Sequence, residues 1–290
     1  MINSELRSQI VNDYVNNKLS LPQTKLKYGV SYKCITDSVR KAGFQLRSIS
    51  EGMNKIPVDE NYFKKIDSHA KAQILGFIGA DGCLSQTTKF SKTISIGLNS
   101  IDLPYLEWIE FQLKFDGEIK TTPSRNSYSD KGFISRLTFC NQILCEDIQK
   151  LGIHERKSLT LDFPTPEQVP NEFLSSYILG YFEGDGCISH GISNQNKIWS
   201  YVGICCTKSF GEKLQQILSE RGIKSSMKRK KDLAKRSINS WSLTIDSSQP
   251  IIKFLDWIYR DSVYQMERKY QTYKEFRKQY DENGVFLKRN

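Results

Sequence analysis

The chain has 290 residues, and its 42 basic and 32 acidic side chains give a formal net charge of +10 at neutral pH. At roughly 100–200 residues per domain, this length predicts about two domains, and an apolar fraction of 38% argues against a disordered chain. The longest apolar runs are far shorter than the roughly 20 residues that a membrane span needs, and the amino terminus does not resemble a secretion signal. We therefore expect a protein with no membrane partner, located in the cytoplasm, the nucleoid or an organellar matrix.

Cysteines and histidines disfavour several kinds of site. The seven cysteines are an odd number without a Cys-x-x-Cys pair, so neither a disulfide framework nor a zinc site is favoured. Only three histidines occur, which disfavours histidine-based nuclease chemistry. The excess of positive charge favours an anionic partner, nucleic acid first, although many proteins are basic without such a partner.

Residues 1–46 predict a domain of three short helices. Ser4, Pro22 and Ser31 are suited to helix starts, and Gly29 and Gly43 to helix ends. A glycine-containing turn before an amphipathic helix is typical of a helix-turn-helix, whose last helix enters the DNA major groove. The first 50 residues hold eight basic and three acidic side chains. We expect DNA contacts from Tyr32, Lys33, Thr36, Arg40 and Arg47; a three-helix cap with a solvated basic face is the alternative.

From about residue 63 the chain repeats itself. The segment Ile74–Cys83 is echoed 104 residues later by Ile178–Cys187, and both contain an Asp-Gly pair. A Glu-Arg-Lys triplet recurs at 155–157 and 267–269. We therefore predict the helical domain at 1–46, a linker at 47–62, a first repeat at 63–165 and a second repeat at 166–290.

Both repeats show the same order of predicted elements: a strand, a helix, a pair of strands and a last helix. In the first repeat these fall at 92–99, 103–115, 119–140 and 142–151, and in the second at 199–206, 210–221, 225–245 and 250–259. This order predicts an α+β fold of two similar halves, not a parallel sheet of βαβ units.

The repeated segment is typical of a helix that crosses a second copy of itself. Each copy has two glycines on one helical face, where glycine lets two backbones approach closely; they are Gly76, Gly79, Gly180 and Gly184. The residues suited to cap these helices are Asp67 or Ser68 in the first copy and Asn171 in the second.

A crossing at these glycines would bring Asp81 and Asp185 together at the helix C-termini, beside the free carbonyl groups of Ala80 and Gly184. Two carboxylates and two carbonyls offer the oxygen ligands that a hard cation such as Mg²⁺ prefers. Without a cation, the carboxylates and the negative helix ends would repel one another. The sequence therefore predicts a metal site formed by these four residues.

Both segments resemble the LAGLIDADG motif of homing endonucleases, and the two-repeat chain is similar to the monomeric members of that family over about residues 63–275. The resemblance implies two pseudo-symmetric αββαββα halves, whose saddle-shaped antiparallel sheets lie on the major groove of a long double-stranded DNA target. The motif acid that binds the catalytic metal, Mg²⁺ or Mn²⁺, matches Asp81 and Asp185. Gly79 departs from the motif, since an acid is usual there; the second copy has Glu183, which we interpret as structural.

The resemblance also implies one basic residue per half near the scissile phosphates, and Lys157 and Lys269 of the recurring triplets match it. We interpret them as catalytic auxiliaries that stabilise phosphate charge or lower the pKa of the attacking water network. One aspartate per strand implies a metal-dependent double-strand break, which in the family leaves short 3′ overhangs.

Basic residues on the predicted hairpins would supply DNA contacts. Residues 224–236 alone hold seven basic side chains and one acid. A charge run is usually a solvated surface, but a sheet placed on DNA favours phosphate contact. The expected contacts are Lys120, Arg125, Arg136, Lys228, Arg229, Lys230, Lys231 and Arg236.

Two alternatives keep the same fold. An intron maturase would bind RNA as a splicing cofactor, and a catalytically inactive regulator would bind DNA without cutting it. The presence of both motif acids ranks the endonuclease first.

Overall fold

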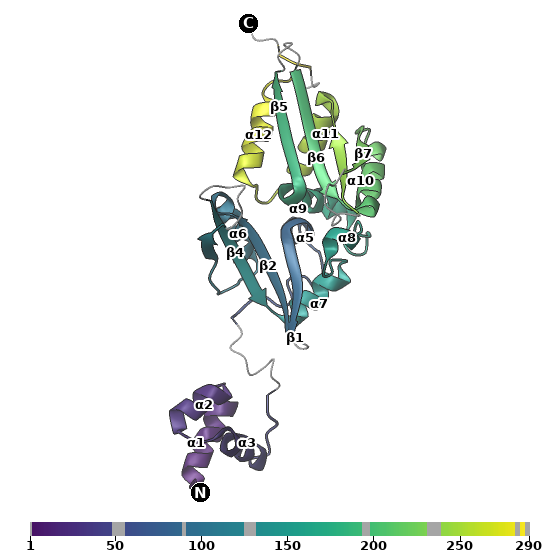
Figure 1. Cartoon of the computed structure of the whole chain (residues 1–290). Coiled ribbons are helices and arrows are strands. Elements are labelled where there is room, and N and C mark those ends of the chain that lie inside the picture. The colour runs from purple at the N-terminus through teal and green to yellow at the C-terminus, as the bar shows by residue number, and fades with distance from the viewer. Residues whose placement is uncertain are drawn as a thin grey trace. The chain divides into compact units, whose positions relative to one another are not determined.

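The computed structural model of the chain describes residues 2–47, 56–88, 91–124, 132–192, 198–230, 239–281 and 285–287. The chain divides into two compact units, the first built mainly from residues 1–56 and the second from most of the remaining chain (Figure 1). Among the described helices, none combines the length and the apolar character that a membrane crossing requires.

The first unit consists of three helices, as the sequence predicts: α1 (Ser4–Val15), α2 (Leu21–Tyr28) and α3 (Tyr32–Lys41). Asn3 caps α1 through its side chain, so the predicted Ser4 cap is one residue late. Ser20 caps α2 in a capping box with Gln23, and Ser31 caps α3 as predicted. Gly29 adopts the left-handed conformation that separates α2 from α3.

Apolar side chains hold this unit together, and one buried acid ties two of its helices. Ile10, Ile35 and Val39 are completely buried. Asp13 of α1 accepts hydrogen bonds from Lys27 Nζ at 2.6 Å and from the Tyr28 hydroxyl at 2.7 Å. These bonds lower the pKa of Asp13 to about 2, so its charge is retained at any physiological pH.

The second unit contains two halves with the same order of elements. The first half comprises α5 (His69–Asp81), β1 (Gly82–Thr88), β2 (Ser91–Asn99), a 3₁₀ turn (Ser100–Asp102), α6 (Leu103–Gln112), β3 (Lys120–Pro123), β4 (Phe133–Cys140), α7 (Gln142–Lys150) and the short α8 (Lys157–Thr160). The second half comprises a 3₁₀ turn (Asn171–Phe173), α9 (Leu174–Asp185), β5 (Gly186–Ile192), β6 (Ile198–Cys206), α10 (Lys208–Glu220), β7 (Ser226–Arg229), β8 (Trp241–Ile245), α11 (Ser248–Tyr259) and α12 (Glu267–Arg277).

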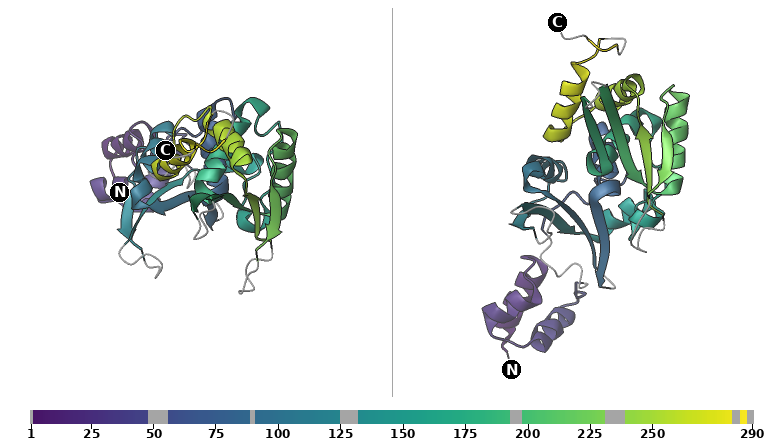
Figure 2. Two further views of the ribbon diagram at one scale, coloured as in Figure 1. Left: turned by 90° about the horizontal axis from the view of Figure 1, so that it is seen from above. Right: turned by 45° about the horizontal axis from the view of Figure 1, so that its top comes forward.

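Each half has one four-stranded sheet, in the order β1-β2-β4-β3 or β5-β6-β8-β7. The strand pairs with described registers are antiparallel. Helices pack on the sheets: α6 contacts β4, α10 contacts β7 and β8, and α11 contacts β6. Figure 2 shows, in its left view, that the helices of both halves gather on the same side of the two sheets. The predicted α+β fold of two αββαββα halves is confirmed.

Some elements differ from the residue-based expectations. The strands β1 and β5 follow the repeated segment directly, and residue patterns alone did not indicate them. The helix α12 was also missed. Asn171 does not cap α9, because it opens a 3₁₀ turn and makes no capping hydrogen bond.

Candidate active site at the crossing of two helices

The helices α5 and α9 pack against each other at the centre of the second unit. Every residue from Ala72 to Ala80 of α5 is buried, and so is every residue from Leu174 to Glu183 of α9. A helix that is buried all round needs a partner on one face and its own sheet on the other. The apolar repeats therefore form the interface between the two halves.

Glycine allows the close approach at this crossing, as predicted. A Cβ atom on Gly76 would overlap the carbonyl oxygen of Tyr177, and one on Gly180 would overlap that of Gln73. A Cβ atom on Gly184 would overlap the Ala80 side chain. Gly79 differs from these three, because its Cβ would meet only ordinary van der Waals contacts, 3.5 Å or more away.

This crossing brings the two motif aspartates together. Asp81 and Asp185 are the last residues of α5 and α9, and the glycine after each is extended and begins a strand. The Asp81 carboxyl group lies 3.3 Å from the position that a Cβ atom on Gly184 would take. Asp81 is therefore next to the last turn of α9, which contains Asp185. Asp81 is exposed to solvent, and Asp185 is half-buried.

The electrostatic environment makes both aspartates harder to ionise. Desolvation raises the pKa of Asp81, against the charges of Lys269, Lys157 and Arg268. Desolvation and the charge of Asp81 raise the pKa of Asp185, against Lys157 and Lys269. Two carboxylates that disfavour each other's charge are stabilised by a cation between them.

The two triplet lysines cap the C-termini of the motif helices. Lys157 Nζ donates a hydrogen bond to the carbonyl oxygen of Ala80, at the end of α5. Lys269 Nζ donates to four carbonyl oxygens at the end of α9: Phe182 at 2.9 Å, Glu183 at 2.7 Å, Gly184 at 3.3 Å and Gly186 at 2.6 Å. A cation is favoured at the negative end of a helix, so both contacts also stabilise the fold.

Each lysine also faces the carboxylate of the other half. Burial lowers the pKa of Lys157, and the charges of Asp185 and then Asp81 oppose that effect. Burial and the charge of Arg268 lower the pKa of Lys269 to about 8, while Glu183 and Asp81 oppose them. The structure therefore brings all four predicted catalytic residues into one cluster.

Glu183 lies inside the protein, consistent with the structural interpretation. Its carboxylate is completely buried and accepts hydrogen bonds from the Met266 backbone N–H at 2.7 Å and from Gln73 Nε2 at 3.1 Å. Burial raises the pKa of Glu183 to about 7. These bonds join α5, α9 and the segment before α12, and they leave Glu183 away from the aspartate pair.

The donor set fits a hard divalent cation. Asp81 and Asp185 offer carboxylate oxygens, and the Ala80 and Gly184 carbonyl oxygens accept lysine hydrogen bonds but retain a second lone pair. Within the part of the chain that the structure describes, no three His, Cys, Asp or Glu side chains cluster around a possible metal. Water or phosphate oxygens would complete the shell, as is usual for Mg²⁺.

Arg268 is a neighbour of this site that sequence reasoning missed. Its Nε donates to both carboxylate oxygens of Asp102, at 2.9 and 3.1 Å, and so joins α12 to the first half. The recurring Glu-Arg-Lys triplet was the available signal, but it drew attention to the lysine alone.

The predicted basic contacts on the sheets are exposed where the structure describes them. Lys120, Arg136, Lys228, Arg229 and Lys230 all lie on or beside the strands β3, β4 and β7. Arg125, Lys231 and Arg236 lie outside the described residues.

The predicted contacts of the first unit separate into two groups. Tyr32, Lys33 and Arg40 are exposed on α3, and Thr36 is half-buried. Arg47 is instead bound within the unit, because its guanidinium donates to the carbonyls of Lys18 and Leu19 and stacks on the Tyr14 ring. We assign Arg47 to the stability of this unit.

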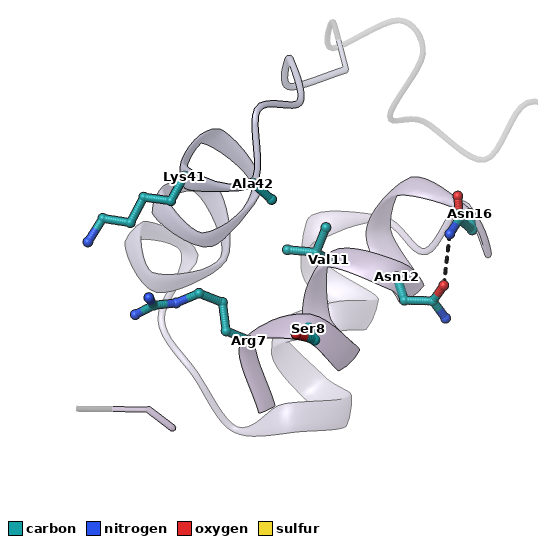
Figure 3. A pocket seen from close by; sticks show the side chains of 7 residues that line it. All are labelled: Arg7, Ser8, Val11, Asn12, Asn16, Lys41 and Ala42. Atoms are coloured by element: carbon teal, nitrogen blue, oxygen red, sulfur yellow. Dashed lines mark hydrogen bonds between the residues drawn. The ribbon is translucent and has the colours of Figure 1, made fainter. Parts of the chain in front are cut away.

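A surface pocket of about 360 Å³ lies between α1 and α3 (Figure 3). Arg7 and Lys41 line it, and neither forms an ion pair with another described residue. This pocket adds positive surface to α1, beside the basic side chains of α3.

Part of the chain matches a known protein family. Residues 172–259 match the family of LAGLIDADG-like domains, a stretch that runs from the turn before α9 to the end of α11. A comparison with curated proteins found no match.

Solved structures of three proteins resemble the chain. The meganuclease I-SmaMI bound to uncleavable DNA is 13% identical, with 71% of this chain and 88% of that chain covered and a TM-score of 0.46. The I-LtrWI LAGLIDADG homing endonuclease bound to target DNA is 13% identical, with 75% and 99% covered and a TM-score of 0.45. The LAGLIDADG meganuclease I-AabMI bound to uncleaved DNA is 14% identical, with 71% and 91% covered and a TM-score of 0.45.

Proposed function

We propose that this chain, whose residues 172–259 form a LAGLIDADG-like domain, is a monomeric, site-specific endonuclease for double-stranded DNA. It would hydrolyse one phosphodiester bond in each strand of a long target site, with Mg²⁺ or Mn²⁺ as cofactor, and leave short 3′ overhangs. The observation that carries this proposal is the meeting of Asp81 and Asp185 at the ends of two crossed helices, each with a capping lysine nearby.

Asp81 and Asp185 would hold the cation, with the Ala80 and Gly184 carbonyl groups close by. A bound divalent cation supplies an activated water and charge for the attacking and leaving oxygens of a phosphodiester. The chain's own contribution is positioning: Lys157 and Lys269 are fixed by helix-end carbonyls, so their charges stay in place beside the reacting phosphate.

The remaining basic residues would bind the DNA. The exposed residues Lys120, Arg136 and Lys228–Lys230 lie on or beside the strands β3, β4 and β7. The exposed side chains of α3 would add a second contact, as in a helix-turn-helix. Such a protein acts where DNA is present, in a nucleoid or an organellar matrix.

Cleavage of plasmid DNA tests the proposal. The purified full chain is incubated with Mg²⁺ or Mn²⁺ and a plasmid library of candidate targets. The library includes intron-lacking alleles of genes from the same organism. We expect double-strand breaks at one sequence with short 3′ overhangs, and no breaks after the metal is chelated. Intact plasmid throughout the library would overturn the proposal.

The same samples distinguish the two alternatives. Specific retention of a DNA sequence without any cut would indicate a regulator, and stronger retention of intron RNA than of DNA would indicate a maturase. Deletion of residues 1–46 should shorten the protected DNA segment and leave cleavage in place. An unchanged footprint would assign the first unit to a structural cap.

A further inference from the structure

Lys230 lies at the edge of the cavity that contains Asp185. This cavity has a volume of about 200 Å³ and is lined by Asp185, Lys157, Cys205 and Ser240, among others. The ammonium group of Lys230 donates a hydrogen bond to Cys205 Sγ at 2.6 Å. Its backbone N–H donates to the Ser240 carbonyl oxygen at 2.9 Å, so both ends of the residue are fixed to the cavity wall.

The charge of Lys230 acts on the second motif aspartate. Desolvation raises the pKa of Asp185, and Lys230 is one of three lysines that oppose this rise. The bond to Cys205 raises the pKa of Lys230, with a further contribution from Asp185. Lys230 therefore keeps its positive charge beside Asp185 at neutral pH.

The registers of the two sheets identify the matching residues in the first half. Ile96 pairs with Leu137, and Ile204 pairs with Leu243; all four side chains are buried. Superposing these pairs matches the strand β2 with β6 and the strand β4 with β8. The same alignment matches Lys120 of β3 with Lys228 of β7. Lys120 lies opposite Arg136 in its sheet, and Lys228 lies opposite Ser242.

Two residues after Lys120 and Lys228, the halves differ. Lys230 matches Thr122, which has no charge, and Cys205 matches Gly97, which has no side chain to hold a cation. In the first half, the Arg136 guanidinium packs over Gly97 and donates to Ser95 Oγ at 3.3 Å. The charges of Lys157 and Lys269 lower the pKa of both aspartates; Arg268 adds to them at Asp81, and Lys230 adds to them at Asp185.

We propose that Lys230, held in place by Cys205, is a phosphate-binding residue of the Asp185 centre alone. This inference rests on the proposed nuclease function and adds an asymmetry to it. The strand cut at the Asp185 centre depends on Lys230, and the strand cut at the Asp81 centre does not. A phosphate oxygen is the matching ligand, because an ammonium group forms strong charge-assisted hydrogen bonds with it.

Strand-resolved kinetics test this asymmetry. A target duplex labelled on both strands is cut by excess enzyme in a single turnover, and the rate for each strand is measured separately. Lys230→Met should slow one strand about tenfold and leave the other within about twofold, since removal of one positioned charge typically costs a tenfold change or more. Lys230→Arg should restore most of the rate, and Cys205→Ala should give a smaller loss on the same strand.

Lys228→Met is the matched control. Lys228 is an exposed lysine two residues away on β7, and it has the counterpart Lys120 in the first half. Its loss should weaken DNA binding and, at subsaturating enzyme, slow both strands by the same factor. Equal slowing of both strands by Lys230→Met would overturn the inference while wild-type cleavage upholds the nuclease. A wild-type enzyme that cuts neither strand would overturn both.

Discussion

The two halves of the second unit contain the same Glu-Arg-Lys triplet, but they position its lysine differently. Lys269 is 6% exposed, lies on the eleven-residue helix α12 and contacts four carbonyl oxygens. Lys157 is half-buried, opens the four-residue helix α8 and, among the described residues, donates to the carbonyl oxygen of Ala80 alone. The repeated triplet therefore indicates that each lysine lies at the end of a motif helix, but it does not indicate how deeply each lysine is buried.

Removal of either motif carboxylate should have the largest effect, because both halves contribute to one metal site. Asp81→Asn and Asp185→Asn should each lower cleavage by about a thousandfold or more, while DNA binding without metal is largely retained. Plasmid cleavage and gel retardation measure the two properties. Glu267→Gln, an exposed acid beside the triplet lysine, serves as the control and should cut normally.

Wild-type cutting by either aspartate variant would show that the halves do not share a site. Loss of one strand only would show that the two carboxylates do not share a cation and that each holds its own.

The next largest effect is expected at the helix crossing, where alanine substitutions at Gly180 and Gly79 should differ in their effect on stability. Gly180→Ala should destabilise the protein by roughly 3 kcal/mol, because the new methyl group overlaps the Gln73 carbonyl oxygen and the backbones must separate. Gly79→Ala should change the free energy of unfolding by less than about 1 kcal/mol, since its surroundings have room. Denaturant unfolding at pH 7 measures both, and equal losses would contradict the reported close approach.

The sequence predicted the parts of this site that depend on repeated spacing. Glycine recurrence indicated the crossing of α5 and α9, and it placed Asp81 and Asp185 together. Contacts that appear in only one half could not be predicted in this way. Arg268 bonds to Asp102, and Lys230 bonds to Cys205. The repeated triplet marks Arg268 but not its partner Asp102, and no repeat marks Lys230 or Cys205. The fold followed the same rule, since α12 lacks the apolar periodicity that revealed α10.

A buried acid occurs at the sixth motif position in the second half only, where the first half has Gly79. Glu183 has a pKa raised to about 7 by burial, from an ordinary value near 4.5. A raised carboxyl pKa means that the folded protein binds a proton more tightly than the unfolded chain, so stability falls as pH rises from 4.5 to 7. This loss should amount to roughly 3 kcal/mol.

Glu183→Gln should remove this pH dependence, because an amide stays neutral throughout. Unfolding free energies at pH 4.5, 5.5 and 7 measure the slope in both proteins. An identical slope in the variant would show that Glu183 is ionised in the fold and that its hydrogen bonds from Met266 and Gln73 outweigh the cost of burial.

The smallest expected effect is the difference in stability between variants of the two triplet lysines, Lys269 and Lys157. Lys269→Met should cost about 2 kcal/mol of stability, because it leaves buried carbonyl acceptors at the end of α9 without a donor. Lys157→Met should cost less than about 1 kcal/mol, since solvent can replace its single contact. Thermal unfolding at pH 7 without metal isolates this structural role from catalysis. Equal losses of stability would mean that water reaches the carbonyl groups at the end of α9 as readily as those at the end of α5. The deeper burial of Lys269 would then add nothing to stability.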